Sequence, residues 1–120
     1  MRTIIAGSRG CTDKRELLAA LAECGWTPTV VISGAAPGAD TLGEEWAKKF
    51  NVPCERYPAD WKRLGKSAGH QRNQQMATAA EALIALWDGT SPGTHHMITA
   101  AKRRGLRIHI YMTNAKEDET

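Results

Sequence analysis

The sequence predicts an α/β domain of three layers, in which about five mainly parallel strands form one sheet with helices on both of its faces. Two observations support this fold class. Short apolar runs rich in β-branched residues alternate with longer stretches of helical periodicity. The strands lead through turns of small residues into helices, which is the connection that parallel strands require.

The first two strands are expected to lead through glycine-containing turns into helices. A strand over residues 3–6 precedes a Gly-Ser-Arg-Gly turn and a helix that begins near Asp13 and that Gly25 ends. A second strand over residues 29–32 precedes a longer turn of small residues. The helix after it runs to about Phe50, with apolar side chains at helical spacing.

The rest of the chain continues the alternation around one long polar segment. The expected strands and helices cover, in order, residues 54–57, 70–80, 82–87, 95–104 and 107–111. The segment over residues 58–69 is expected to lack regular structure and to act as a lid or a binding element. Because crossovers between parallel strands are right-handed, these elements predict a doubly wound, Rossmann-like sheet.

Length and composition indicate one domain over residues 1–112, followed by a polar tail over residues 113–120. No apolar run reaches the roughly 18–20 residues of a membrane span, and no signal peptide is recognised, so we expect a cytoplasmic protein without a membrane partner. The three cysteines lack the paired spacing of a zinc site or a disulfide framework. The net charge of +3 is too small for a dedicated duplex-DNA binder.

Three small-residue turns should meet at the carboxyl edge of the sheet, where parallel sheets bind ligands. Glycine allows close approach to a ligand, and the amides that begin a helix favour phosphate, so a phosphorylated ligand is expected. The candidate residues of these turns are Gly7, Ser8, Arg9, Gly34, Ala35, Ala36, Gly38, Ala39, Asp40, Asp88, Gly89, Ser91, Gly93 and Thr94. The alternative is that the glycines only make tight turns and that the hydroxyls only cap helices.

The polar segment and the helix after it add cations and an indole to the candidate site. Trp61 can stack on the base of a nucleotide, and Lys66, Arg72 and Asn73 can bind the phosphate or the sugar of the same nucleotide. Arg9 can bind a phosphate bidentately, or it forms only a surface salt bridge. The alternative for the whole segment is a solvated basic loop with a buried Trp61 as its anchor.

Taken together, these motifs resemble those of the SLOG superfamily, and most closely its short single-domain YspA or cYpsA-like branch of bacteria and phages. The motifs are Gly7-Ser8-Arg9, the run from Ser33 to Asp40, Trp61 with Gly65, Lys66, Ala68, Gly69, Arg72, Asn73 and Met76, and the run from Trp87 to Thr94. The resemblance implies a Rossmann-like nucleotide-binding fold. Relatives include the LOG phosphoribohydrolases, the DprA single-strand-binding proteins and sensors of nucleotide-derived signals.

The resemblance to the phosphoribohydrolases is incomplete at one carboxylate. Where their Gly-Thr pair is aligned with Gly93-Thr94, their catalytic Glu corresponds to Met97, which can neither activate water nor stabilise an oxocarbenium ion. The candidate catalytic residues are therefore Asp88, Arg72 and Asp40, with Glu44 and Asp60 as further carboxylates. Each has a simpler explanation, because Asp40 can stabilise the start of a helix and Asp88 can make an Asp-Gly turn.

Three functions stay open at this point. The first is a nucleotide-binding sensor or processing domain, the second is a nucleotide N-glycoside hydrolase, and the third is binding of single-stranded nucleic acid through the basic segment. No cofactor is expected, and no metal site, because His95 and His96 are adjacent and diverge by about 100° on a helix. The resemblance also implies a homodimer or a larger homo-oligomer.

Overall fold

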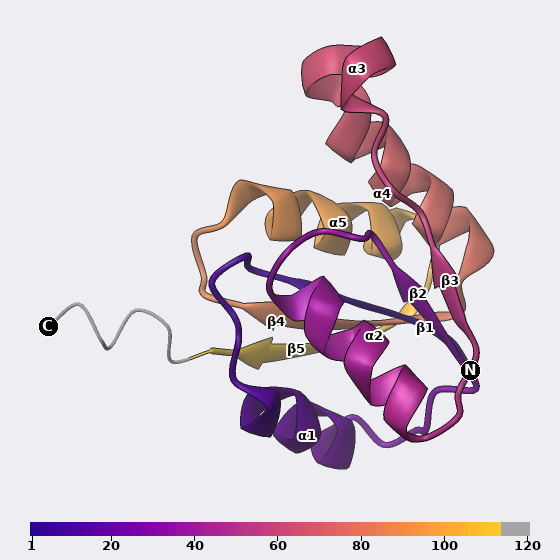
Figure 1. Cartoon of the computed structure of the whole chain (residues 1–120), viewed down its shortest axis with the longest axis vertical. Helices are drawn as coiled ribbons and strands as arrows, with labels where there is room; N and C mark the ends of the chain where they lie inside the picture. The colour runs from indigo at the N-terminus through magenta and orange to yellow at the C-terminus, as the bar shows by residue number, and fades with distance from the viewer. Residues whose placement is uncertain (114–120) are drawn as a thin grey trace, which may run out of the picture.

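A parallel sheet of five strands forms the centre of the computed structural model, which describes residues 1–113 (Figure 1). The strands are β1 (Arg2–Gly7), β2 (Val30–Ser33), β3 (Cys54–Arg56), β4 (Ala82–Trp87) and β5 (Arg107–Met112). They lie in the order β3-β2-β1-β4-β5, and every neighbouring pair is parallel. The predicted three-layer, Rossmann-like fold is confirmed.

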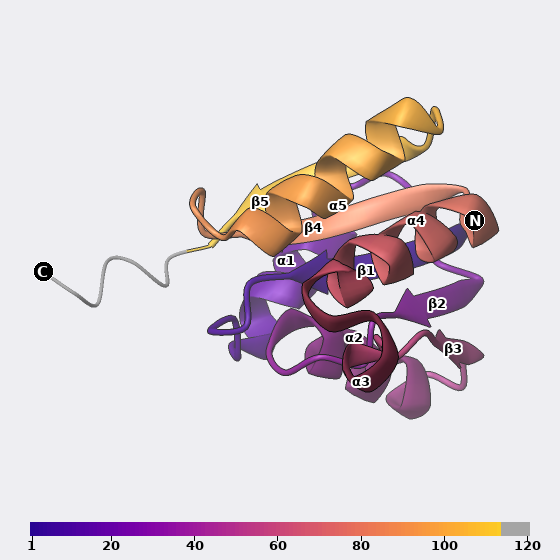
Figure 2. The ribbon, with the colours of Figure 1, turned by 90° about the horizontal axis from the view of Figure 1, so that it is seen from above.

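Helices cover both faces of this sheet. They are α1 (Lys14–Glu23), α2 (Ala39–Lys49), the short α3 (Trp61–Leu64), α4 (Ala68–Ala79) and α5 (Pro92–Arg103), with a 3-10 turn, η1 (Gly65–Ser67), between α3 and α4. Figures 1 and 2 place α1 and α2 on one face and α4 and α5 on the other. None of the helices within the described part of the chain has the length and apolar character that crossing a bilayer requires.

The strands place alternate side chains in two separate cores. Ile4 and Leu83 face α4 and α5, whereas Ile5 and Ile84 face α1 and α2, and all four side chains are fully buried. Full burial of such a side chain contributes about 1.5–3 kcal/mol. β1 and β4 therefore form the most protected part of the fold, and the ligand edge is built on their ends.

The expectation of an unstructured segment over residues 58–69 is wrong, because α3, η1 and the start of α4 occupy most of it. The Asp60 carboxylate caps α3 by accepting a hydrogen bond from the Arg63 amide, with N···O 3.2 Å. Gly65, at φ +57°, lets the chain turn sharply before η1. A second correction is that α5 begins at Pro92, several residues earlier than expected, because proline is favoured in a first helical turn.

The order of the strands also fixes where a ligand can enter. The chain crosses from β1 to β2 and β3 in one direction, and then to β4 and β5 in the other, so its direction reverses between β1 and β4. Connections that leave the sheet in opposite directions open a crevice at the carboxyl ends of those two strands. Of the expected polar tail, residues 114–120 lie outside the described residues.

Candidate functional site

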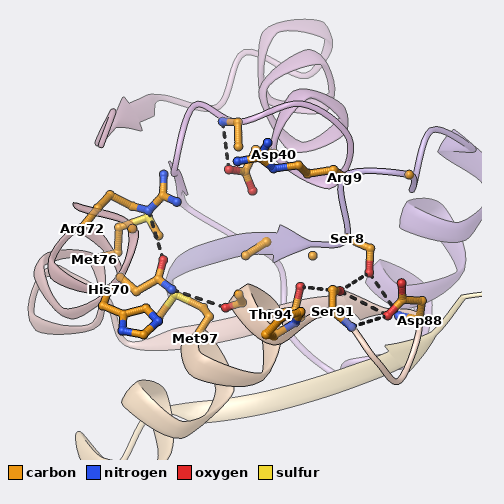
Figure 3. A pocket seen from close by; sticks show the side chains of 18 of the residues that line it. Ser8, Arg9, Asp40, His70, Arg72, Met76, Asp88, Ser91, Thr94 and Met97 are labelled. Carbon is orange, nitrogen blue, oxygen red and sulfur yellow. Dashed lines mark hydrogen bonds between the residues drawn. The ribbon is translucent and has the colours of Figure 1, made fainter. Parts of the chain in front are cut away.

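A cavity of about 570 Å³ opens at the carboxyl ends of β1 and β4, where the crevice is expected (Figure 3). Its walls come from the turn after β1, the start of α2, the α3–α4 segment and the start of α5. The predicted residues that line it are Gly7, Ser8, Arg9, Ala36, Asp40, Trp61, Lys66, Arg72, Asn73, Asp88, Ser91, Gly93 and Thr94. The structure thus brings together residues from all four motifs.

The other predicted residues, Gly34, Ala35, Gly38, Ala39 and Gly89, lie outside the cavity lining. Gly38 lies directly against the turn after β1, since a Cβ on it would come within 2.3 Å of the Arg9 carbonyl oxygen and 2.5 Å of the Ser8 carbonyl oxygen. The Ala39 amide donates to that Ser8 oxygen, with N···O 3.3 Å. The turn after β2 therefore packs on the turn after β1 and holds it in place.

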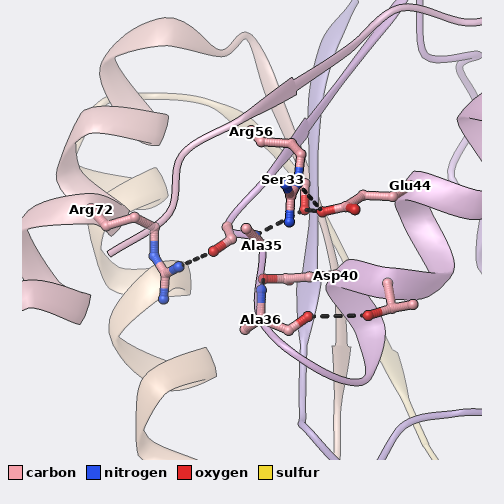
Figure 4. Close-up of polar contacts among 9 residues, drawn as sticks. Ser33, Ala35, Ala36, Asp40, Glu44, Arg56 and Arg72 are labelled. Atoms are coloured by element: carbon pink, nitrogen blue, oxygen red, sulfur yellow. Dashed lines mark hydrogen bonds and ion pairs between the residues drawn. The ribbon is translucent and has the colours of Figure 1, made fainter. Parts of the chain in front are cut away.

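Gly34 makes room for two charged side chains at the end of β2. A Cβ here would lie 2.6 Å from Nη1 of Arg72 and 2.8 Å from Oδ2 of Asp40. Arg72 also donates a hydrogen bond to the Gly34 carbonyl oxygen. Figure 4 shows this arginine reaching from α4 to the turn that carries Ala35 and Ala36, with Asp40 next to that turn.

Asp40 is a buried carboxylate with 6% of its surface exposed. Burial raises its pKa from 3.8 to about 6, although the Ala36 amide, which donates to Oδ2 at 3.1 Å, and the positive charges of Arg72 and Arg9 oppose this rise. Gly38 rather than Asp40 is the N-cap of α2. A carboxyl group with a pKa near 6 can exchange a proton close to neutral pH, as a general base requires.

Two arginines that line the cavity supply positive charge to it. Arg72 is partly buried and donates through Nε to Oδ1 of Asn73 at 3.0 Å. Burial lowers the pKa of Arg72, and the nearby charge of Arg9 lowers it further. Because burial removes water from a guanidinium group, an anionic partner stabilises its positive charge more than it would at an exposed position. Arg9 is exposed and is free to approach a ligand from the open side.

A hydroxyl network joins the turns after β1 and β4. The Ser8 and Ser91 hydroxyls lie 2.8 Å apart, and the Asp88 amide donates to Oγ of Ser8 at 3.2 Å. Oδ1 of Asp88 in turn accepts from the amides of Thr90 and Ser91, both at 2.8 Å. These bonds, that from Thr90 foremost, lower the pKa of Asp88 to about 2. Asp88 therefore stays ionised and shapes the turn, which leaves Asp40 as the carboxyl group suited to proton transfer.

Ser91 is the N-cap of α5, but its side chain makes no hydrogen bond to the helix amides. Its hydroxyl group instead donates to Asp88 at 3.1 Å and contacts the Thr94 hydroxyl at 3.3 Å. The first-turn amides of a helix have no intrahelical acceptors. The Gly93 and Thr94 amides of the first turn of α5 thus lack acceptors within the helix, and both residues line the cavity.

The α3–α4 segment forms the outer wall. The alternative of a buried Trp61 anchor is wrong, because 51% of this side chain is exposed. Its indole lies over Gly69, where a Cβ would come within 3.3 Å of the ring. Lys66 lines the cavity, whereas Arg63 pairs with Asp60 at 3.2 Å and does not. The basic segment is thus divided between the site and the solvent.

Met97, at the position of the missing catalytic Glu, is buried and lines the cavity. Of the alternative carboxylates, Glu44 lies outside the lining, where it accepts from the Ser33 hydroxyl at 2.5 Å and from Nε of Arg56 at 3.2 Å. Within residues 1–113, no group of three or more His, Cys, Asp or Glu side chains is placed to hold a metal ion.

Sequence reasoning missed several lining residues, among them Ala6, Gly10 and Pro92. Gly69 was part of a motif but had no assigned role. Its lack of a side chain lets the Trp61 indole lie close to the start of α4, a contact that the sequence does not reveal. Ala6 and Gly10 carry no sequence signal either, since their place in the wall depends on the register of β1 and on the turn that follows it.

Comparisons with known proteins agree with this architecture. Residues 1–64 match the model of the family described as "YspA, cpYpsA-related SLOG family". The chain is also 38% identical, over 116 residues, to the "Gene 61 protein" of Mycobacterium phage D29, a match that covers 89% of this chain and 93% of the phage protein. No solved structure matches. On this evidence, the chain belongs to the YspA, cpYpsA-related SLOG family.

Proposed function

We propose that this chain binds a nucleotide or a nucleotide-derived ligand in the cavity at the ends of β1 and β4, as a sensor or a processing domain. One observation carries the proposal: a partly buried Arg72 and the start of α5 face the same cavity at the point where the strand order reverses. Helix amides and a guanidinium both favour phosphate oxygens. Membership of the SLOG family supports a nucleotide-related function.

Each wall has a part in this proposal. The phosphate lies between Arg72 and the first-turn amides of α5, and Arg9 adds a second guanidinium from the open side. Trp61 stacks on the base, since an exposed indole beside a cavity offers a flat apolar surface. Asp40 accepts hydrogen bonds from ribose hydroxyls. Lys66 and Asn73 complete the polar contacts.

Replacing Arg72 with glutamine should weaken nucleotide binding at least tenfold, because a hydrogen bond to a charged group contributes about 1.5–3 kcal/mol. The measurement is calorimetric titration of the purified chain with nucleoside monophosphates, ADP-ribose, NAD and cyclic nucleotides. Arg72→Lys should restore only part of the affinity, since lysine keeps the charge but not the two parallel donors.

The matched control is Arg63→Gln, which removes one positive charge from α3 without touching the cavity lining. It should leave the affinity unchanged. Equal affinity of Arg72→Gln and the wild type, at equal thermal stability, would remove Arg72 from the site. An affinity that grows with oligonucleotide length and falls steeply with salt would favour single-strand binding instead.

A second candidate function, hydrolysis of the N-glycosidic bond of a nucleotide, is favoured by Asp40. This reaction breaks the bond between the anomeric carbon and the base, adds water to that carbon, and gives the departing base its electron pair and a proton. A general base must accept a proton from the water. Asp40 is the carboxyl group in the cavity whose pKa is raised toward neutrality, to about 6.

Incubation of the chain with the same ligand panel tests this candidate, with the free base followed by chromatography and mass detection. A hydrolase should release base, and Asp40→Asn should abolish the release because an amide cannot accept the proton. Glu45→Gln, on the exposed side of the same helix, should leave it intact. Retention of an unaltered nucleotide with no free base would mark the chain as a binding module.

A further inference from the structure

A second hollow of about 620 Å³ adjoins the first one, on the outer surface between α4 and α5. We call it the α4–α5 groove; it is lined by residues of these two helices and by Arg104, which caps α5. Figure 2 shows α4 and α5 side by side above the sheet. His70 and Pro92 line both the groove and the cavity, so the two hollows meet at these residues.

The groove concentrates groups that are positive or can become positive. Arg103 and Arg104 lie at one end of it, and three histidines, His70, His95 and His96, line it. The residues that line the groove, all within the described part of the chain, include no Asp or Glu. Neither arginine belongs to an ion pair among the described residues. Their charges are thus available to a ligand.

The histidines of the groove are held in a fixed arrangement. The rings of His70 and His96 stack with their centroids 3.8 Å apart and their planes within 6° of parallel. The Asn73 amide nitrogen lies 3.1 Å from Nδ1 of His96. This contact leaves Nε2 as the ring atom of His96 that can donate to a ligand, and Asn73 connects the ring to the cavity lining.

The surroundings of His96 disfavour its protonation while the groove is empty. Burial lowers its pKa, and electrostatic interactions with His70, Arg103 and His95 lower it further. An anion in the groove would oppose these electrostatic interactions and raise the pKa of His96. Anion binding and protonation of His96 are then linked, each favouring the other.

Cations at the carboxyl end of a helix also have a simpler role, because they stabilise the helix dipole. That role explains Arg103 and Arg104 on α5, but it equally explains Lys102, which lies outside the groove. It does not explain why three imidazoles gather at the other end of the same hollow, or why two of them stack. A ligand that carries negative charge accounts for both ends.

We propose that the α4–α5 groove is a second anion-binding subsite, contiguous with the cavity, and that the ligand is a small nucleotide with two separate anionic groups. One group lies beside Arg72 and the other lies between the imidazoles and Arg103. The statement about the ligand rests on the proposed nucleotide function, whereas the statement that the groove binds anions does not. A nucleotide bisphosphate and a short dinucleotide both have this chemistry.

The first arm of the test uses inorganic pyrophosphate as the probe and the full chain labelled with ¹⁵N. Histidine ring signals are followed by NMR during the titration. Those of His95 and His96 should shift and saturate, and the pKa of His96 should rise. In the double variant R103Q/R104Q the apparent affinity should fall at least tenfold, whereas Lys102→Gln, the matched control, should bind as the wild type does.

Arg72→Gln separates the groove from the cavity. If pyrophosphate shifts the ring signals in this variant as well, the anion is bound in the groove. Loss of the shifts in Arg72→Gln alone would place the anion in the cavity and overturn the groove as an anion site. If Lys102→Gln and R103Q/R104Q lose the same amount of affinity for pyrophosphate, the binding depends only on the overall charge of the protein. That result would also overturn the groove as an anion site.

The second arm compares the four ribonucleoside 5′-monophosphates with the corresponding 5′-phosphorylated dinucleotides. R103Q/R104Q should weaken dinucleotide binding at least tenfold and leave monophosphate binding unchanged. Equal affinities of wild type and variant for both ligands would overturn the claim that one ligand reaches both hollows. If pyrophosphate binds the groove but no nucleotide binds the wild type, the proposed function fails, and with it the claim about the ligand, while the anion subsite stands.

Discussion

Replacement of Gly38 by alanine should lower the free energy of unfolding by about 3 kcal/mol or more, since strained backbone and overpacking each cost about 1–3 kcal/mol. The residue has φ 84° and ψ −124°, a backbone conformation that residues other than glycine rarely adopt. A Cβ here would also lie 2.3 Å from the Arg9 carbonyl oxygen. That oxygen belongs to the backbone and cannot move aside as a side chain could. Urea unfolding followed by circular dichroism measures the change.

Gly10→Ala is the matched control, because Gly10 belongs to the turn against which Gly38 packs. A Cβ on Gly10 would meet nothing within 4 Å. Its free energy of unfolding should stay within about 0.5 kcal/mol of the wild-type value, as for other surface substitutions. A Gly38→Ala protein as stable as Gly10→Ala would show that the two turns can separate without loss, contrary to the packing described above.

Asp40→Asn should make the ligand-free protein more stable at pH 8, by about 1–3 kcal/mol at 1.36 kcal/mol per pKa unit. Burial raises the pKa of Asp40 from its ordinary value of 3.8, which the unfolded chain retains, to about 6 in the folded protein. Between these values the folded state holds more protons than the unfolded state, so this group makes stability fall as the pH rises. Above pH 6 the full cost of the buried charge is present; below pH 4 it has disappeared.

The measurement is the difference in unfolding free energy between the wild type and Asp40→Asn from pH 4 to pH 8. The difference should grow as the pH rises from about 4 to about 6 and then level off, because the other titrating groups are common to both proteins. Glu45→Gln, at an exposed position on the same helix, is the matched control for replacing a carboxyl group by an amide. A flat curve for Asp40→Asn would mean that its carboxylate is not destabilised by burial. If Asp40→Asn gives the expected curve and also abolishes hydrolysis, the buried Asp40 carboxylate lowers the stability of the protein but is required for its activity.

Much of the fold could be predicted from local signals. The strand over residues 82–87 was predicted with its observed bounds, because an unbroken apolar run between two turns allows few alternatives. The α3–η1 segment could not be predicted in this way. Its helical turns depend on Asp60 and on the positive φ of Gly65 rather than on any hydrophobic periodicity. Short helical turns of this kind are stabilised by individual side-chain contacts that composition does not reveal.

The candidate site was predictable in position but not in the division of roles. The alternation of strands and helices predicted that the turns share the carboxyl edge of the sheet, and the observed strand order places those after β1 and β4 together. Asp40 and Asp88 look alike in sequence, as carboxylates beside glycine-containing turns. Their pKa values move in opposite directions because one is buried and the other accepts several hydrogen bonds, and only three-dimensional packing decides which. The α4–α5 groove likewise depends on how two helices pack.

The pairing of β1 with β4 has a consequence for how the protein is synthesised. Thr3 pairs with Ala82, so β1 can pair with β2 but lacks its other neighbour until β4 has been synthesised. Translation adds about 5–20 residues per second, and parallel strands far apart in sequence pair slowly. During that interval the edge of β1 that later pairs with β4 has unpaired backbone groups. Because Thr94 and Met97 belong to the cavity lining, the complete ligand site can form only after α5 has been synthesised.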